Sequence, residues 1–175
     1  MGKKGEHIIL IGFMGAGKTT LGKKLARRLE REFVDTDDLV ERREGRPIFD
    51  IFAREGEAYF RGLETEALRS LERREEGCVI AVGGGLPMQE VNRPILKELG
   101  CVVFLEAKTE TLMQRLKNDT KRPKLQGGDL RERIETLMRE RETTYRQTAD
   151  VFVSTDNRSY GGILDEIIEK AIKNS

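Results

Sequence analysis

A loop near the N-terminus has the residue types and spacing that bind the phosphates of a nucleotide. Gly12-Phe-Met-Gly-Ala-Gly-Lys18-Thr19 matches the pattern G-x-x-x-x-G-K-[ST], and it lies between an apolar run and a segment with helical spacing. Glycines let backbone N–H groups surround phosphate oxygens, and Lys18 is expected to reach the β- and γ-phosphates. The Thr19 hydroxyl is a hard oxygen ligand of the kind that Mg²⁺ prefers. The alternative is a glycine-rich turn without a nucleotide, which the number of constrained positions disfavours.

Two carboxylates follow the second apolar run, where a strand would end. In Phe33-Val-Asp35-Thr-Asp37 the two-residue period of a strand puts Asp35 and Asp37 on one side of the chain. The carboxyl end of a strand in an open α/β sheet faces the ligand crevice, so one acid would serve Mg²⁺ and the other a substrate hydroxyl. The alternative is a helix N-cap followed by an acidic first turn.

Two arginines lie on segments with helical spacing. Arg61 has Glu57 four residues before it and Glu64 three residues after it, so a surface salt bridge is the simplest interpretation. Arg141 continues an apolar stripe with Leu137, which aims its guanidinium toward the apolar side of the helix. An inward arginine needs an anionic partner, and a substrate carboxylate would pair with it in bidentate fashion. The alternative is a side chain that snorkels at a helix end.

Three consecutive glycines, Gly83 to Gly85, end the third apolar run. Glycines would let the backbone approach a ligand closely and donate an N–H group to it. The alternative is a tight turn after a buried strand.

The elements that must position these residues are predicted by five apolar runs of strand length, each followed by a segment with helical spacing. This alternation predicts a parallel sheet covered by helices, in a three-layer α/β sandwich. We expect one domain over residues 1–175, in which the polar segment 117–129 is a long mobile loop of the kind that forms lids. The runs are His7–Ile11, Phe33–Thr36, Cys78–Val82, Cys101–Leu105 and Val151–Val153.

Composition excludes several classes of function. Lys plus Arg (32) nearly balances Asp plus Glu (31), which argues against nucleic acid or an anionic membrane as the main partner. His7 is the single histidine and opens the first apolar run, so any catalytic base must be a carboxylate. Cys78 and Cys101 form no metal or disulfide framework. With neither a signal segment nor a membrane-length apolar stretch, we expect a soluble cytoplasmic protein.

Taken in order, the motifs resemble those of the shikimate kinase family. They are the phosphate-binding loop, Phe-Val-Asp-Thr-Asp, Ile-Phe…Gly-Glu…Phe-Arg, Gly-Gly-Gly, Arg-Pro and Arg-x-x-x-Tyr, from about Ile8 to about Gly162. The resemblance implies a P-loop fold like that of nucleoside monophosphate kinases, with a five-stranded parallel sheet and a mobile lid. It implies Mg²⁺-dependent transfer of phosphate from ATP to the 3-hydroxyl of shikimate, in aromatic amino acid biosynthesis, by an enzyme expected to be a monomer.

The resemblance also implies which residues bind ATP and its metal. Thr19 and Asp35 would serve Mg²⁺ beside the phosphate-binding loop. Arg122, in the predicted lid, would fold over ATP, while Arg115 and Arg158 match positions near the adenine. The residues implied at the ATP phosphates are Gly15, Ala16, Gly17, Lys18, Thr19 and Thr20.

The resemblance further implies a shikimate site, formed in part by a helical region of about residues 37–64. Asp37 would meet the substrate hydroxyls, and Arg61 and Arg141 would clamp the carboxylate. Gly84 would contact the substrate through its backbone. The implied catalytic residues are Lys18, Asp37 and Arg122.

Two positions depart from the family pattern. Thr19 stands where many relatives carry serine, which keeps the hydroxyl. The predicted lid reads Arg-Pro-Lys-Leu where the family commonly has Arg-Pro followed by two leucines, which adds a charge to the lid.

Two alternatives stay open on the residues alone. Another small-metabolite kinase, acting on gluconate or a nucleoside monophosphate, would have the same ATP half. The pair of Arg61 and Arg141 with Asp37 favours a compact hydroxylated carboxylate instead. A non-catalytic nucleotide-sensing module is the second alternative, and the presence of Lys18, Thr19 and Asp35 argues against it.

Overall fold

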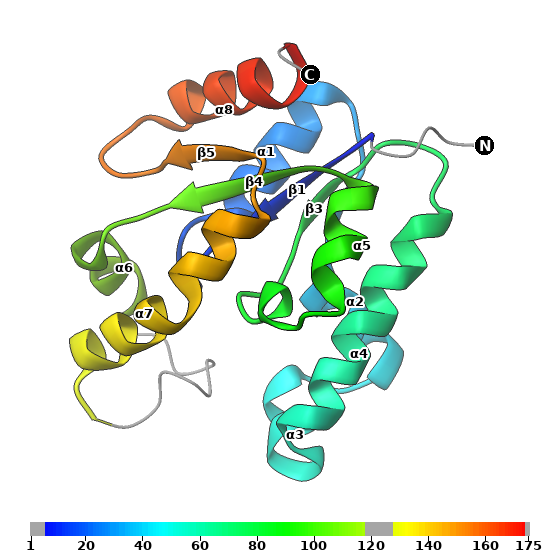
Figure 1. The fold of residues 1–175 in the computed structure, drawn as a ribbon, viewed down its shortest axis with the longest axis vertical. Coiled ribbons are helices and arrows are strands. Elements are labelled where there is room, and N and C mark those ends of the chain that lie inside the picture. The colour runs from blue at the N-terminus through cyan, green and yellow to red at the C-terminus, as the bar shows by residue number, and fades with distance from the viewer. Residues whose placement is uncertain (1–5, 118–127, 174–175) are drawn as a thin grey trace.

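A parallel sheet of five strands forms the centre of the molecule, in the order β2-β3-β1-β4-β5 (Figure 1). The computed structural model describes residues 6–117 and 128–173. Helices cover both faces of the sheet, so the predicted three-layer α/β fold is confirmed, and each predicted strand is correct to within one residue at either end. The strands are β1 (His7–Ile11), β2 (Phe33–Asp35), β3 (Val79–Ala81), β4 (Gly100–Glu106) and β5 (Val151–Ser154).

The central strand β1 is buried along its whole length because it contributes to two hydrophobic cores, one on each face of the sheet. Successive side chains of a strand point to opposite faces. Ile9 and Ile11 therefore pack in one core with Leu68 and Tyr145, whereas Leu10 packs in the other with helices from both ends of the chain. A strand that is apolar at every position is typical of a parallel sheet with both faces covered.

The helices divide between the two faces (Figure 1). The helix after the phosphate-binding loop and the last helix pack on one face, as their predicted apolar stripes require. The other face carries three helices directly, and a group of short helices extends beyond it. The helices are α1 (Lys18–Leu29), α2 (Thr36–Glu44), α3 (Ile48–Glu55), α4 (Glu57–Ser70), α5 (Asn92–Leu99), α6 (Thr109–Leu116), α7 (Leu130–Thr148) and α8 (Tyr160–Ile168), with short turns at Leu71–Arg73, Leu86–Met88 and Glu169–Lys173.

One predicted boundary is wrong for a physical reason. Thr36 was expected to end the second strand, but it begins α2, because the Asp35 carboxylate accepts from the backbone N–H groups of Asp37 (2.8 Å) and Asp38 (3.4 Å). This N-cap satisfies donors that the first turn of a helix leaves unpaired. The alternative interpretation of the acidic segment as a cap is therefore correct for Asp35.

His7 has a structural role at the edge of the core. Its Nδ1 accepts a hydrogen bond from the backbone N–H of Cys78 at 2.9 Å, which continues the pairing of β1 with β3. Burial lowers the pKa of this imidazole and keeps it neutral, as an acceptor nitrogen must be.

The predicted lid falls mostly on residues 118–127, and these, with Arg122, lie outside the described residues. Within residues 6–117 and 128–173, no helix has the length and apolar character needed to cross a membrane.

Candidate active site

A cleft of about 1190 Å³ opens where the phosphate-binding loop, α2, α4 and α7 meet. Every site residue predicted from the sequence and described by the structure lines it. These residues are Gly15, Ala16, Gly17, Lys18, Thr19, Thr20, Asp35, Asp37, Arg61, Gly84, Arg115, Arg141 and Arg158. The carboxyl ends of the strands are the expected place for a ligand in an open α/β sheet.

The phosphate-binding loop joins β1 to α1 through backbone that only glycine adopts easily. Gly15 and Gly17 have positive φ angles of 82° and 99°, and Gly17 is the N-cap of α1. The first turn of α1 therefore directs its backbone N–H groups into the cleft, where they suit an anion. The Lys18 ammonium bonds the carbonyls of Gly12 (2.6 Å) and Phe13 (3.1 Å), which holds it over the loop.

Thr19 and Asp35 meet at the edge of this loop. The Thr19 hydroxyl donates to Oδ2 of Asp35 at 3.1 Å, while Oδ1 of the same carboxylate caps α2. Asp35 thus fits both interpretations of the acidic segment: one carboxylate oxygen caps a helix, and the other lies beside Thr19 at the phosphate-binding loop. An alcohol and a carboxylate oxygen beside a phosphate site form a donor set that fits Mg²⁺, which takes few protein ligands and keeps several waters.

The opposite part of the cleft contains an ion pair with one buried member. Arg61 is 13% exposed and donates to Glu64 at 2.6 Å and to Glu57 at 3.2 Å, so the predicted salt bridges are present. Glu64, however, is fully buried rather than on the surface. Burial raises its pKa from 4.5 to about 7, although the Arg61 guanidinium acts in the opposite direction, and Asp37 raises the pKa further. At neutral pH this carboxyl is therefore protonated, and so uncharged, in a substantial fraction of the molecules.

Arg141 is buried as its helical stripe predicted, with 5% of its surface exposed. Its guanidinium carbon lies 5.9 Å from the centre of the Phe13 ring. Among the described residues, Nη1 of Arg141 and Oε2 of Glu64 are the buried side-chain polar atoms without a hydrogen-bond partner. Such groups are costly unless a ligand completes them, so they mark where polar groups of a substrate belong.

Each glycine of the run Gly83 to Gly85 lies directly against a charged side chain of the cleft. A Cβ atom on Gly83 would lie 2.8 Å from carboxylate oxygens of both Asp37 and Glu64. On Gly84 it would lie 3.1 Å from Nη1 of Arg141, and on Gly85 it would lie 2.4 Å from Nη2 of Arg61. The glycines are therefore needed for close approach of protein side chains, as well as for any approach to a ligand.

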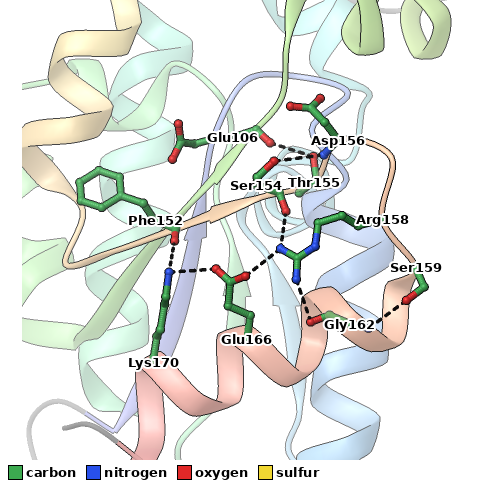
Figure 2. A network of polar contacts seen from close by, with 10 residues as sticks. All are labelled: Glu106, Phe152, Ser154, Thr155, Asp156, Arg158, Ser159, Gly162, Glu166 and Lys170. Carbon is green, nitrogen blue, oxygen red and sulfur yellow. Dashed lines mark hydrogen bonds and ion pairs between the residues drawn. The ribbon is translucent and has the colours of Figure 1, made fainter.

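Arg115 and Arg158 line the cleft on the side of β4 and β5. Arg115, on α6, donates to the carbonyl of Gly15 at 2.8 Å. Arg158, between β5 and α8, has its guanidinium bound by α8 and by the end of β5, as Figure 2 shows.

Sequence reasoning gave no site role to Glu64, Tyr145 or Tyr160, although Tyr145 is the tyrosine of the Arg-x-x-x-Tyr motif. The burial of Glu64 was not visible from its spacing to Arg61. Tyr145 is buried, and its hydroxyl donates to the carbonyl of Gly84 at 2.5 Å. Its place four residues after Arg141, on the same helical stripe, was the available signal. Tyr160 lines the cleft with 54% of its surface exposed, an unusual exposure for a large aromatic residue.

Comparison with known proteins gives the family. The family model described as "Shikimate kinase" matches residues 14–172. The chain belongs to the shikimate kinase family. A curated shikimate kinase of Aromatoleum aromaticum is 44% identical over 167 residues, which cover 95% of this chain and 94% of that protein.

Solved structures of the shikimate kinase family agree with the fold. The shikimate kinase from Acinetobacter baumannii in complex with shikimate has a TM-score of 0.92 at 38% identity, over 98% of this chain and 95% of that one. The shikimate kinase from Aquifex aeolicus has a TM-score of 0.83 at 38% identity, over 96% and 97% of the two chains. The likeness to the family thus extends over both sides of the cleft.

The buried Glu64 predicts a pH dependence of stability. Its folded pKa of about 7 lies above the ordinary value of 4.5, so its stabilising contribution is fully present below pH 4.5 and is lost as pH rises through 7. The free energy of unfolding should fall by about 2 kcal/mol between pH 5 and pH 8 relative to Glu64→Gln, which cannot ionise. Urea unfolding at both pH values measures this difference.

Glu66→Gln is the matched control, because Glu66 lies on the same helix and is exposed. This variant should keep the pH slope of the wild type. Parallel pH profiles for the wild type and Glu64→Gln would show that Glu64 ionises normally despite its burial.

Proposed function

We propose that this protein transfers the γ-phosphoryl group of ATP to the 3-hydroxyl of shikimate and so forms shikimate 3-phosphate, as an enzyme of aromatic amino acid biosynthesis. The observation that carries the proposal is the position of Asp37, Arg61 and Arg141 in one cleft with a complete phosphate-binding loop. A compact acid with several hydroxyls would satisfy all three side chains at once.

In the ATP half, the loop from Gly15 to Thr20 would hold the phosphates. Lys18 would exchange its present carbonyl acceptors for phosphate oxygens as charge spreads over the transferred group. Thr19 and Asp35 would hold Mg²⁺, which when bound neutralises charge on the phosphates. Because the transition state is loose, positioning and charge neutralisation dominate the catalysis.

In the acceptor half, Arg61 and Arg141 would bind the carboxylate of shikimate and Asp37 would orient the attacking hydroxyl. The buried Nη1 of Arg141 would gain the anionic acceptor that it lacks among the described residues. The hydroxyl proton leaves late in a loose transition state, so we expect orientation to be the larger role of Asp37. The backbone of Gly84, fixed by Tyr145, would complete the contact surface.

The proposed roles of the lid and of the whole chain extend this picture. Arg122 remains a predicted lid residue that would close over ATP, and lid closure would exclude water and limit ATP hydrolysis. We also propose a single domain that acts as a cytoplasmic monomer, and the free thiols of Cys78 and Cys101 support a reducing compartment.

The test is ADP release from the purified protein with MgATP, in parallel reactions with shikimate, gluconate, nucleoside monophosphates or no acceptor. We expect strong dependence on shikimate, and loss of turnover in Asp37→Asn with ATP binding retained. Turnover with another acceptor would reject the proposal in favour of a different small-metabolite kinase. Stoichiometric ATP binding without turnover on any acceptor would indicate a nucleotide-sensing module.

Gly85→Ala should raise the KM for shikimate by about 10- to 100-fold, because a 1 Å misplacement of a binding group has effects of this size. The new Cβ would lie 2.4 Å from the Arg61 guanidinium, and the end of a side chain moves more easily than the backbone. The fold and the KM for ATP should therefore be preserved. Steady-state kinetics with each substrate varied in turn measures the two KM values separately.

Gly62→Ala is the matched control on the residue after Arg61. A Cβ there would meet no atom of the described residues within 4 Å, and Gly62 is inside α4. This variant should keep both KM values and gain about 0.5–1 kcal/mol of stability from the helix. An unchanged KM for shikimate in Gly85→Ala would show that shikimate binding does not depend on the present position of the Arg61 guanidinium.

A further inference from the structure

The strand order separates the cleft into two sides. β1 leads into the phosphate-binding loop at the centre, while Asp37 and the glycine run follow β2 and β3 on one side. Arg115 and Arg158 follow β4 and β5 on the other side. Phosphates bound at the loop, with the acceptor beside Asp37, leave the β4–β5 side for the rest of the nucleotide. The loop from Thr155 to Tyr160 forms the outer wall there, with Thr155, Arg158 and Tyr160 lining the cleft.

Asp156 ties this wall to the helix that carries Arg115. Its Oδ1 accepts from the backbone N–H of Lys108 at 2.9 Å and from the hydroxyl of Thr111 at 2.7 Å. The carboxylate thus caps the N-terminus of α6 from a loop that is distant in sequence, where a negative charge also suits the helix dipole. Next to it, Thr155 binds the carbonyl of Glu106 at the end of β4 through both its N–H and its hydroxyl, at 2.9 Å each.

Arg158 ties the same wall to α8 (Figure 2). Its guanidinium donates to the carbonyls of Ser154 (3.0 Å) and Gly162 (3.2 Å) and to Glu166 (2.8 Å). Glu166 in turn accepts from Lys170 at 2.9 Å, and Lys170 donates to the carbonyl of Phe152 at 2.9 Å. The network closes the loop on the helix that follows it, so Arg158 is engaged in shaping the wall.

We propose that Asp156 and Glu166 are positioning residues for the nucleoside half of ATP. Asp156 holds the wall against α6 at a fixed distance from Arg115, and Glu166 holds it against α8 through Arg158. A wall that is fixed before binding spares the cost of ordering a loop when the nucleotide enters. The inference rests on the proposed use of ATP and is independent of the acceptor.

The test compares two probes that share the phosphates but differ in the nucleoside: ATP and inorganic tripolyphosphate, each with Mg²⁺, by calorimetry on the full chain. Asp156→Ala should weaken ATP about 10-fold, as expected for the loss of a preorganised wall, and leave tripolyphosphate within about twofold. Asp156→Asn should retain most ATP affinity, because its amide oxygen can accept from both donors of α6. In turnover, the KM for ATP should rise in Asp156→Ala while the KM for shikimate stays constant.

Glu166→Ala tests the second tie, and Asp165→Ala is its control. Asp165 is the preceding residue on α8, with 76% of its side chain exposed and a contact to Arg28. Glu166→Ala should weaken ATP but not tripolyphosphate, and Asp165→Ala should change neither.

Two outcomes would overturn the inference. If ATP and tripolyphosphate weaken together in Asp156→Ala, the loop acts through the fold of the phosphate site. If neither changes in Asp156→Ala and Glu166→Ala, the wall does not contact the nucleoside. The calorimetric titrations with ATP and with tripolyphosphate contain no acceptor, so failure of shikimate turnover would reject the proposed acceptor without affecting their result.

Discussion

Lys18→Ala should lower kcat with shikimate by about 1000-fold, since loss of one preorganised donor to a developing charge has an effect of this order. In the structure the ammonium is already held over the phosphate-binding loop by two carbonyls, so little reorganisation is needed when ATP is bound. Its charge matters most as the transferred phosphoryl group separates from ADP. Coupled measurement of ADP release under saturating substrates gives kcat directly.

Lys97→Ala provides the control, because Lys97 is an exposed lysine in the last turn of α5. It should retain wild-type kcat, and thermal unfolding should show that both variants are folded. A fall in kcat of less than tenfold in Lys18→Ala would mean that other groups carry the charge stabilisation.

Arg141→Ala should lower kcat/KM for shikimate by about 100- to 1000-fold, the range expected when one partner of a buried charge pair is removed. Arg141→Lys should recover only part of this loss, because an ammonium cannot make the planar bidentate contact. ATP affinity should be unchanged. The free energy of unfolding should change little, since removal of a buried cation whose Nη1 has no partner among the described residues offsets the lost packing of its side chain on Phe13.

Arg139→Ala is the matched control for this pair of variants, because Arg139 is exposed on the same helix, α7. It should leave kcat/KM unchanged. If Arg141→Ala lowered both the affinity for ATP and the free energy of unfolding, Arg141 would have a role in the fold instead of in acceptor binding.

Local pattern was sufficient to predict the sheet and the phosphate-binding loop. The five strands are continuous apolar runs, and the loop pattern is contiguous, so both can be found without tertiary information. The inward direction of Arg141 was also predictable, because Leu137 and Arg141 share one stripe of a regular helix.

Features that depend on packing between distant segments could not be predicted. Glu64 stands three residues after Arg61, but the spacing does not reveal that α4 turns this side chain against Gly83. Similarly, Asp156 caps a helix that begins near Lys108, and no local signal links the two segments. The end of β2 was predicted one residue too late, because the sequence around Asp35 fits both the last residues of a strand and the cap of a following helix.

The strand order also bears on how such a protein can diversify. The acceptor side is built on β2 and β3 with α2 to α4 and on Arg141 of α7, and the outer wall is built on β4 and β5 with α6 and α8. The phosphate-binding loop after β1 stands between them. Exchanging the segment from α2 to α4 would therefore replace Asp37 and Arg61 while the nucleotide side and Arg141 of α7 stay in place, so acceptors that share a carboxylate can be exchanged through one contiguous stretch of chain.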